Sequence, residues 1–193
     1  MKHIFSGLLV LTLMSCSAAS AVPVQSPGKS AQVNLSTNET MISDLPVLGK
    51  APELTNEIWL NVDQPLRFAD LRGKVVLLDM WTFGCINCRN VIPSLKGWHT
   101  KYSSEGLVII GNHFPEFESE RSLENLKDAV KRLDIPYAVA QDNDGKTWSA
   151  FNNAYWPSLY LIDKQGNIRY RHIGEGAYSE TEAAIQALLA EPS

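Results

Sequence analysis

Three nearly continuous apolar runs stand out along the chain, and each predicts a buried strand. They are Val75 to Trp81, which is bounded by Gly73 and Gly84, then Leu107 to Gly111, and then Tyr137 to Ala140. Strands without polar alternation are typical of parallel sheets that are covered on both faces. The pattern therefore predicts parallel strands at the centre of the fold.

Helical periodicity follows the first two runs. After Cys85, one helical face collects Ile92, Leu95, His99 and Tyr102. The stretch Glu116 to Leu133 repeats the period and predicts a second helix with an apolar face. Ser179 and Glu182 have the spacing of a capping box, which predicts the start of a last helix.

The last third of the chain carries hairpin signals. Ser158 to Ile162 and Ile168 to Ile173 flank a polar turn in which Gly166 supplies a positive φ. A smaller hairpin is expected earlier, from residues 59–61 and 66–68. Parallel strands joined by helices, followed by an antiparallel hairpin and a helix, predict a mixed α/β sandwich.

The length and composition indicate how many domains the chain forms, and its charge indicates which kinds of partner to expect. The chain has 193 residues, 45% of them hydrophobic, which is enough to bury one sizeable core in one domain. The formal net charge is −4, and no basic patch or aromatic–basic interleaving occurs. Nucleic acid is therefore not an expected partner.

The first 21 residues have the pattern of an export signal. Lys2 gives a positive start, and Ile4 to Met14 is an apolar core that is too short to span a bilayer. Ala19-Ser20-Ala21 suits ordinary signal peptidase, whereas Leu13-Met14-Ser15-Cys16 resembles a bacterial lipobox, in which Cys16 becomes a lipidated N-terminus. We favour the lipobox interpretation. Either cleavage predicts export to the bacterial periplasm, where disulfide chemistry is normal.

A linker is expected between this signal and the folded domain. Residues 22–45 are rich in Ser, Pro, Gln, Asn and Thr and show no helical or strand period. The sequence thus predicts three parts: an export signal at 1–21, a flexible linker at 22–45 and one domain at 46–193.

The candidate chemistry lies where the first buried strand meets its helix, at Cys85-Ile86-Asn87-Cys88. A helix start offers free backbone N–H groups and the positive end of the helix dipole, and both favour a thiolate on Cys85. Two cysteines at this spacing close into a disulfide and reopen. We interpret the pair as a redox site.

Two alternatives for the pair are weaker. A metal site needs more ligands, and His113 is a candidate third ligand without a fourth. A purely structural disulfide more often closes a longer loop. Asp142-Asn143-Asp144-Gly145 also suggests calcium, but Ala140 and Phe151 occupy the first and twelfth positions of that loop. We therefore expect a turn and a helix cap there.

The stretch Trp81-Thr82-Phe83-Gly84-Cys85-Ile86-Asn87-Cys88, with the later Tyr155-Trp156-Pro157, resembles the active site of the thioredoxin-like superfamily. The similarity is greatest to the exported TlpA-like branch and the periplasmic domain of DipZ-type proteins, and it covers roughly residues 49–189. The resemblance implies a thioredoxin fold, a central mixed sheet flanked by helices, with an N-terminal extension and an inserted strand–helix unit around residues 107–133.

The resemblance also implies roles for single residues. Asp79, six residues before Cys85, matches the buried acid that takes the proton from the second cysteine; the alternative is a structural carboxylate. Pro157 matches the cis-proline that faces the cysteines, and Trp81 and Trp156 are expected beside it in a substrate groove. His113 and Glu116 follow the second strand, where an ordinary loop position is the more common outcome.

The implied function is that of an exported thiol–disulfide oxidoreductase, which reduces disulfides of proteins or small molecules through Cys85 and Cys88. It needs no cofactor beyond this redox-active disulfide and no metal, and a membrane or periplasmic thiol donor recharges it. One alternative is a peroxiredoxin-type peroxidase, for which Thr82 fits but Leu78 replaces the required proline. The other is a Sco-type copper module, for which the cysteine spacing is one residue short.

Overall fold

The computed structural model describes residues 45–192. Seven strands form one mixed sheet in the order β1-β7-β6-β3-β4-β5-β2. Their bounds are β1 Gly49–Lys50, β2 Ile58–Leu60, β3 Val75–Trp81, β4 Leu107–His113, β5 Ala138–Gln141, β6 Ser158–Ile162 and β7 Asn167–Ile173. Strands β3, β4 and β5 run parallel, while β6, β7, β1 and β2 join them antiparallel. The predicted mixed α/β architecture is confirmed.

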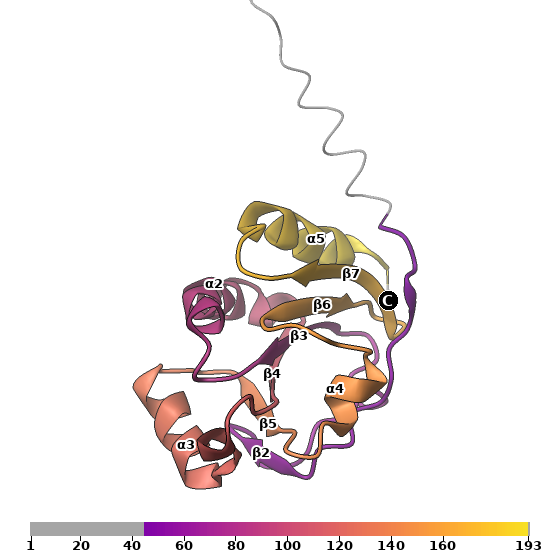
Figure 1. The fold of residues 1–193 in the computed structure, drawn as a ribbon. Helices are drawn as coiled ribbons and strands as arrows, with labels where there is room; N and C mark the ends of the chain where they lie inside the picture. Colours follow the sequence, from indigo (N-terminus) through magenta and orange to yellow (C-terminus); the bar gives the residue numbers. More distant parts are fainter. Residues whose placement is uncertain (1–44, 193) are drawn as a thin grey trace, which may run out of the picture. The chain divides into compact units, whose positions relative to one another are not determined.

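Helices cover both faces of the sheet (Figure 1). Their bounds are α2 Ile86–Tyr102, α3 Leu123–Arg132, α4 Lys146–Ala150 and α5 Tyr178–Ala190, with short 3-10 turns η1 Ser103–Glu105 and η2 Glu118–Arg121. One core cluster joins Leu77 of β3 to α2, α3 and α5, and the other joins Leu78 to α4. Alternate side chains of β3 thus enter opposite cores, as the apolar run predicts.

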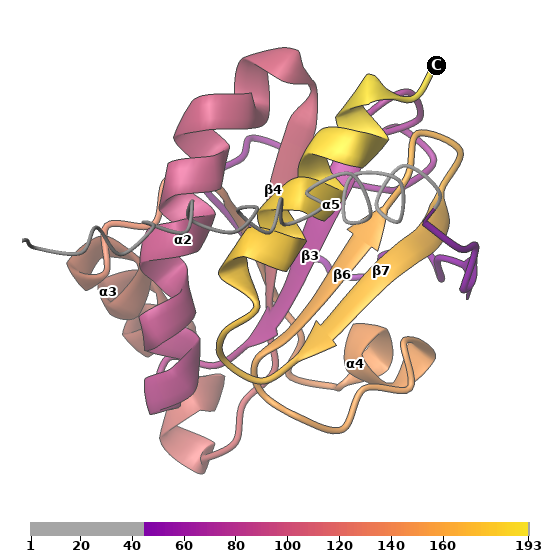
Figure 2. The ribbon, with the colours of Figure 1, turned by 90° about the horizontal axis from the view of Figure 1, so that it is seen from above.

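Strand β3 is the centre of both cores and leads directly into α2 (Figure 2). All seven of its residues are buried, including Asp79. Because β3 pairs with β4 on one side and β6 on the other, its carboxyl end lies between His113 of β4 and Ser158 of β6. The loop that carries Cys85 therefore starts from the middle of the sheet.

Two sequence-based expectations about local structure are wrong. The hairpin of residues 59–61 and 66–68 does not form: β2 pairs instead with β5, so that Trp59 lies opposite Ala140. The helix expected from Glu116 begins only at Leu123, after η2, with Ser122 as its N-cap. In each case a distant partner or a local cap outweighs the periodicity of the sequence.

The capping box of Ser179 and Glu182 also fails to form. Helix α5 begins after Ala177, which has a φ of 47° and gives no side-chain cap. Glu182 accepts hydrogen bonds from Lys101 Nζ at 2.7 Å and Tyr102 Oη at 2.6 Å. The carboxylate therefore ties α5 to α2 instead of capping its own helix.

Candidate active site

Cys85 and Cys88 lie at the start of α2, as the sequence predicts. Cys85 is the N-cap residue, and its Sγ accepts the backbone N–H of Cys88 at 3.4 Å. Both thiols are free; Cys85 is half-buried and Cys88 is only 1% exposed. A substrate disulfide can therefore reach the thiol of Cys85, whereas the thiol of Cys88 is buried in the core.

Asp79 sits in the core beneath the cysteines. It is 1% exposed, and its Oδ1 has no hydrogen-bond partner among the described residues. Burial raises the pKa of Asp79 to about 8. Burial and then the Asp79 charge also raise the pKa of the Cys88 thiol. A charge on Asp79 therefore opposes a thiolate on Cys88, so the two groups are close enough to interact.

His113 at the end of β4 packs behind the cysteine loop. Its ring stacks on Phe83 at 5.2 Å and meets Trp81 edge-on at 5.4 Å, and Nε2 lies 3.3 Å from Thr82 Oγ1. Burial lowers the pKa of His113 to about 4, so the ring is neutral at pH 7. His113 therefore belongs to the packing that supports the loop.

Glu120 is a feature of the site that the sequence analysis missed. This η2 residue is 1% exposed, and its carboxylate accepts the backbone N–H of Gly84, one residue before Cys85, at 2.8 Å. It also accepts the N–H groups of Glu116 at 2.7 Å and Phe117 at 2.9 Å. The only local signal was a glutamate three residues after Phe117, half of a capping-box pattern.

The three residues expected in a substrate groove occupy different environments. The Trp156–Pro157 bond is cis, as expected, and Pro157 is buried. Trp156 is half-buried, donates from Nε1 to the Phe114 carbonyl at 3.2 Å, and packs against the same core cluster as Cys85. Trp81, at 1% exposure, lies within the core. Cys16 lies outside the described residues.

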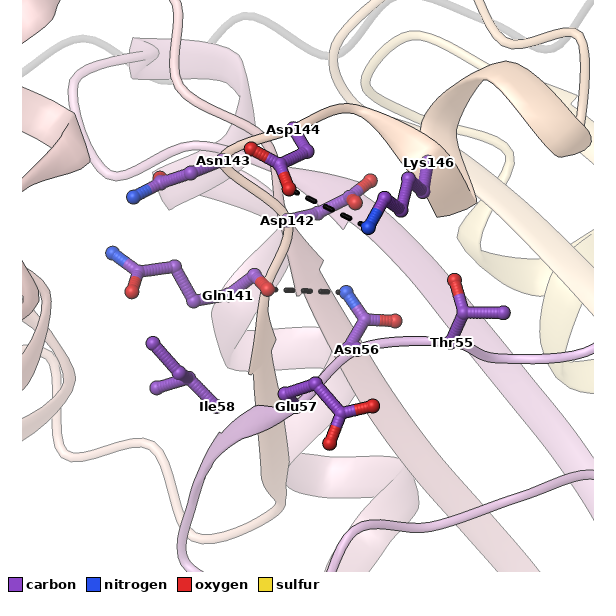
Figure 3. Close-up of a pocket in the computed structure, with 9 residues that line it drawn as sticks. All are labelled: Thr55, Asn56, Glu57, Ile58, Gln141, Asp142, Asn143, Asp144 and Lys146. Carbon is purple, nitrogen blue, oxygen red and sulfur yellow. Dashed lines mark hydrogen bonds and ion pairs between the residues drawn. The ribbon is translucent and has the colours of Figure 1, made fainter.

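A pocket of about 290 Å³, lined mostly by residues with polar side chains, lies between the segment before β2 and the β5–α4 loop and includes neither cysteine (Figure 3). Gly145 is the N-cap residue of α4, and the carboxylate of Asp142, three residues earlier, accepts the N–H groups of Thr147 and Trp148 at 3.2 and 2.8 Å. Asn56 Nδ2 donates to the Gln141 carbonyl at 3.1 Å. The predicted turn and helix cap at residues 142–145 is confirmed.

Two negative findings concern the described part of the chain. Within residues 45–192, no group of three or more His, Cys, Asp or Glu side chains is arranged to hold a metal ion. Across the same residues, no helix has both the length and the apolar character needed to cross a bilayer.

Comparisons with known proteins agree with this geometry. The AhpC/TSA family model matches residues 47–171. Protein DipZ of Mycobacterium tuberculosis is 41% identical over 150 residues, which cover 76% of this chain but 22% of DipZ. The thiol-disulfide oxidoreductase YkuV of Bacillus subtilis is 29% identical over 141 residues, covering 72% of this chain and 94% of YkuV. The chain thus spans about a fifth of the length of DipZ.

Solved structures show the same fold. The thioredoxin-like superfamily protein SPOA0173 superposes with a TM-score of 0.70 at 31% identity, covering 75% of this chain and 99% of that one. A thiol-disulfide isomerase from Corynebacterium glutamicum gives a TM-score of 0.64 at 27% identity, covering 74% and 98%. The chain therefore belongs to the AhpC/TSA family and to the thioredoxin-like superfamily, and it is similar to DipZ and to the thiol-disulfide oxidoreductase YkuV.

Proposed function

We propose that this protein is an exported thiol–disulfide oxidoreductase that reduces disulfides of proteins or small molecules through Cys85 and Cys88. The observation that carries the proposal is the division between the two thiols. Cys85 is half-exposed at a helix N-terminus. Cys88 is buried one turn later, where the charge of Asp79 helps to raise the pKa of its thiol. The first position suits an attacking group and the second a resolving group.

In the first step, the Cys85 thiolate attacks one sulfur of a substrate disulfide. A bond forms between Cys85 Sγ and that sulfur, the substrate S–S bond breaks, and the other substrate sulfur leaves as a thiolate that takes up a proton. The Cys88 N–H, which already donates to Cys85 Sγ, stabilises the negative charge on the attacking sulfur.

In the second step, Cys88 resolves the mixed disulfide. Asp79 accepts the proton of the Cys88 thiol, and the resulting thiolate attacks Cys85 Sγ. The bond to the substrate breaks, and its sulfur leaves and is protonated. Two electrons and two protons have then passed to the substrate, and Cys85 and Cys88 are joined as a disulfide.

The cycle needs no dissociable cofactor, because the disulfide itself is the redox centre. A membrane or periplasmic thiol donor returns two electrons to it. Trp156 and Pro157 lie immediately before β6, and an extended segment of the substrate pairs with their backbone. The buried Trp81 packs in the core and supports the loop that carries Cys85.

Reduction of insulin disulfides by the reduced protein tests this function. The wild-type protein should turn over with a thiol donor, and Cys85→Ser should lose the activity entirely. Peroxide consumption and copper binding are measured on the same sample. Peroxide turnover without insulin reduction would favour a peroxidase, and tight copper binding without insulin reduction would favour a copper module.

Export is tested in cells. We propose that residues 1–21 direct export, that residues 22–45 link this signal to the domain of residues 46–193, and that Cys16 is lipidated. The mature protein should then partition with membranes and incorporate labelled palmitate, and Cys16→Ala should lose both properties. A soluble wild-type protein that begins at Val22 would contradict lipidation but not export.

A further inference from the structure

The Glu120 carboxylate joins two segments that are far apart in sequence. Two of its backbone hydrogen bonds are local, to the N–H groups of Glu116 and Phe117 just before η2. The third reaches back 36 residues to the Gly84 N–H. One buried side chain thus fastens the segment after β4 to the loop that ends at Cys85.

Gly84 is shaped to receive this carboxylate. A Cβ built on Gly84 would lie 2.3 Å from Glu120 Oε1, closer than real Cβ atoms approach another atom. The backbone at Gly84 does not itself demand glycine, because its φ is not positive. The space taken by the carboxylate is therefore the reason for glycine at this position.

The charge of Glu120 has no cationic partner in the described part of the chain. Burial alone would raise the pKa of Glu120, but the hydrogen bonds from Phe117, Thr82, Glu116 and Gly84 outweigh it and lower the pKa, so the group is ionised at pH 7. The ring of His113 beside it is neutral at that pH. No ion pair to Glu120 occurs within residues 45–192. A fixed negative charge therefore lies behind the loop.

We infer that Glu120 is a positioning residue for the reaction of Cys85: it anchors the Gly84 amide and restrains thiolate formation with its uncompensated charge. The inference rests on the proposed function, since it assigns a direction to that chemistry. A pair whose reduced form is stabilised acts as an oxidant. A negative charge disfavours a neighbouring thiolate and so has the opposite effect. Glu120 therefore biases the pair toward giving electrons.

The test is the pH profile of alkylation of the reduced protein by iodoacetamide, with single labelling of Cys85 verified by mass spectrometry. Only the thiolate reacts. Glu120→Gln should raise the rate at pH 7 by about three- to tenfold, because a neighbouring like charge is removed. The difference between the two rates should shrink as the pH is raised toward 10, because the charge on Glu120 affects the rate only through the balance of thiol and thiolate. The equilibrium with glutathione at pH 9 should shift toward the dithiol by a similar factor.

Asp163→Asn is the matched control. Asp163 is also a buried carboxylate that accepts loop N–H groups, those of Gln165 and Asn167, but it follows β6 at the end away from the cysteines. Its variant should lower the urea midpoint of unfolding while leaving the alkylation profile unchanged. Gly84→Ala is a second way to displace the Glu120 carboxylate, because the added methyl group occupies its place. It should raise the rate at pH 7, and the double variant with Glu120→Gln should add nothing further.

Several results would overturn the inference. These are an unchanged or lower rate at pH 7 in Glu120→Gln, a rise that persists undiminished at pH 10, labelling of Cys88, an equal rise in Asp163→Asn, or no shift in the glutathione equilibrium. None of these measurements requires turnover. Loss of insulin reduction by the wild-type protein would therefore remove the proposed function alone.

Discussion

The backbone N–H of Cys88 donates to the Sγ of Cys85 over 3.4 Å, and the two thiols differ sharply in exposure. The first turn of α2 thus carries one accessible thiol and one buried thiol. The consequences can be measured separately for the two steps of the cycle.

Cys88→Ser should leave the attack by Cys85 intact but prevent resolution, because no second thiol remains to displace the substrate. Mixed disulfides with substrates should accumulate and be visible on non-reducing gels, and steady-state turnover should fall to background. Expression of this variant in cells would capture the natural substrates. Normal turnover by Cys88→Ser would show that the two roles are misassigned.

Asp79→Asn should slow resolution about a hundredfold or more, since removal of the Cys88 proton loses its base. In the wild-type protein the resolution rate should rise with pH through about 8, the pKa to which burial raises Asp79. The variant should lose this dependence. Rapid-mixing measurement of the second thiol released reports the step, and the first release is the control. A variant that resolves at the wild-type rate would make Asp79 structural.

Asp79→Asn should also change the free energy of unfolding, and the direction of the change depends on pH. The folded pKa of Asp79 is raised from 3.8 to about 8, so its contribution is fully present below pH 3.8 and is lost as pH rises through 8. Asp79→Asn should therefore become more stable than the wild type as pH rises, by roughly 3–5 kcal/mol at pH 9. Urea unfolding of both proteins from pH 4 to pH 9 measures the difference. A constant gap between the two would refute the assignment.

The titration of His113 should change the stability of the protein in the opposite direction, with stability lost as the pH falls. Its folded pKa is lowered from 6.5 to about 4, so its contribution is present above pH 6.5 and is lost as pH falls toward 4. The loss should amount to about 3 kcal/mol in the wild-type protein. In His113→Gln, which does not titrate, the pH dependence of the urea midpoint should be flatter over this window. Parallel curves would show that other groups cause the acid sensitivity.

Gly111 should tolerate no side chain, because a Cβ there would lie 2.8 Å from Nε1 of the buried Trp81. Gly111→Ala should destabilise the protein by about 1–3 kcal/mol. Gly97 in α2 has open space around it, and Gly97→Ala should instead stabilise by about 1 kcal/mol. Thermal unfolding of the pair gives the comparison. Equal effects would mean that the packing of Trp81 is not tight.

The sequence by itself determined the features that depend on neighbouring residues. Four features follow from short-range signals. The strand before Cys85 follows from an apolar run, the helix after it from a change of period, and the β6–β7 hairpin from a glycine turn. The turn at Asp142, whose carboxylate bonds the first turn of α4, follows from its run of turn-forming residues. Cysteine spacing is a local signal of the same kind. The position of the proposed redox site was therefore predictable before any tertiary contact was known.

The tertiary structure decided what depends on residues far apart in the chain. Trp59 of β2 pairs with Ala140 of β5 and not with the nearby segment of residues 66–68. A strand pairs with the sheet edge that the fold brings beside it. Glu182 bonds to α2 although the local pattern predicts a capping box in its own helix, and Glu120 bonds to the distant Gly84 as well as to its neighbours. A buried carboxylate must find hydrogen-bond donors, and only the folded chain determines which donors come within reach.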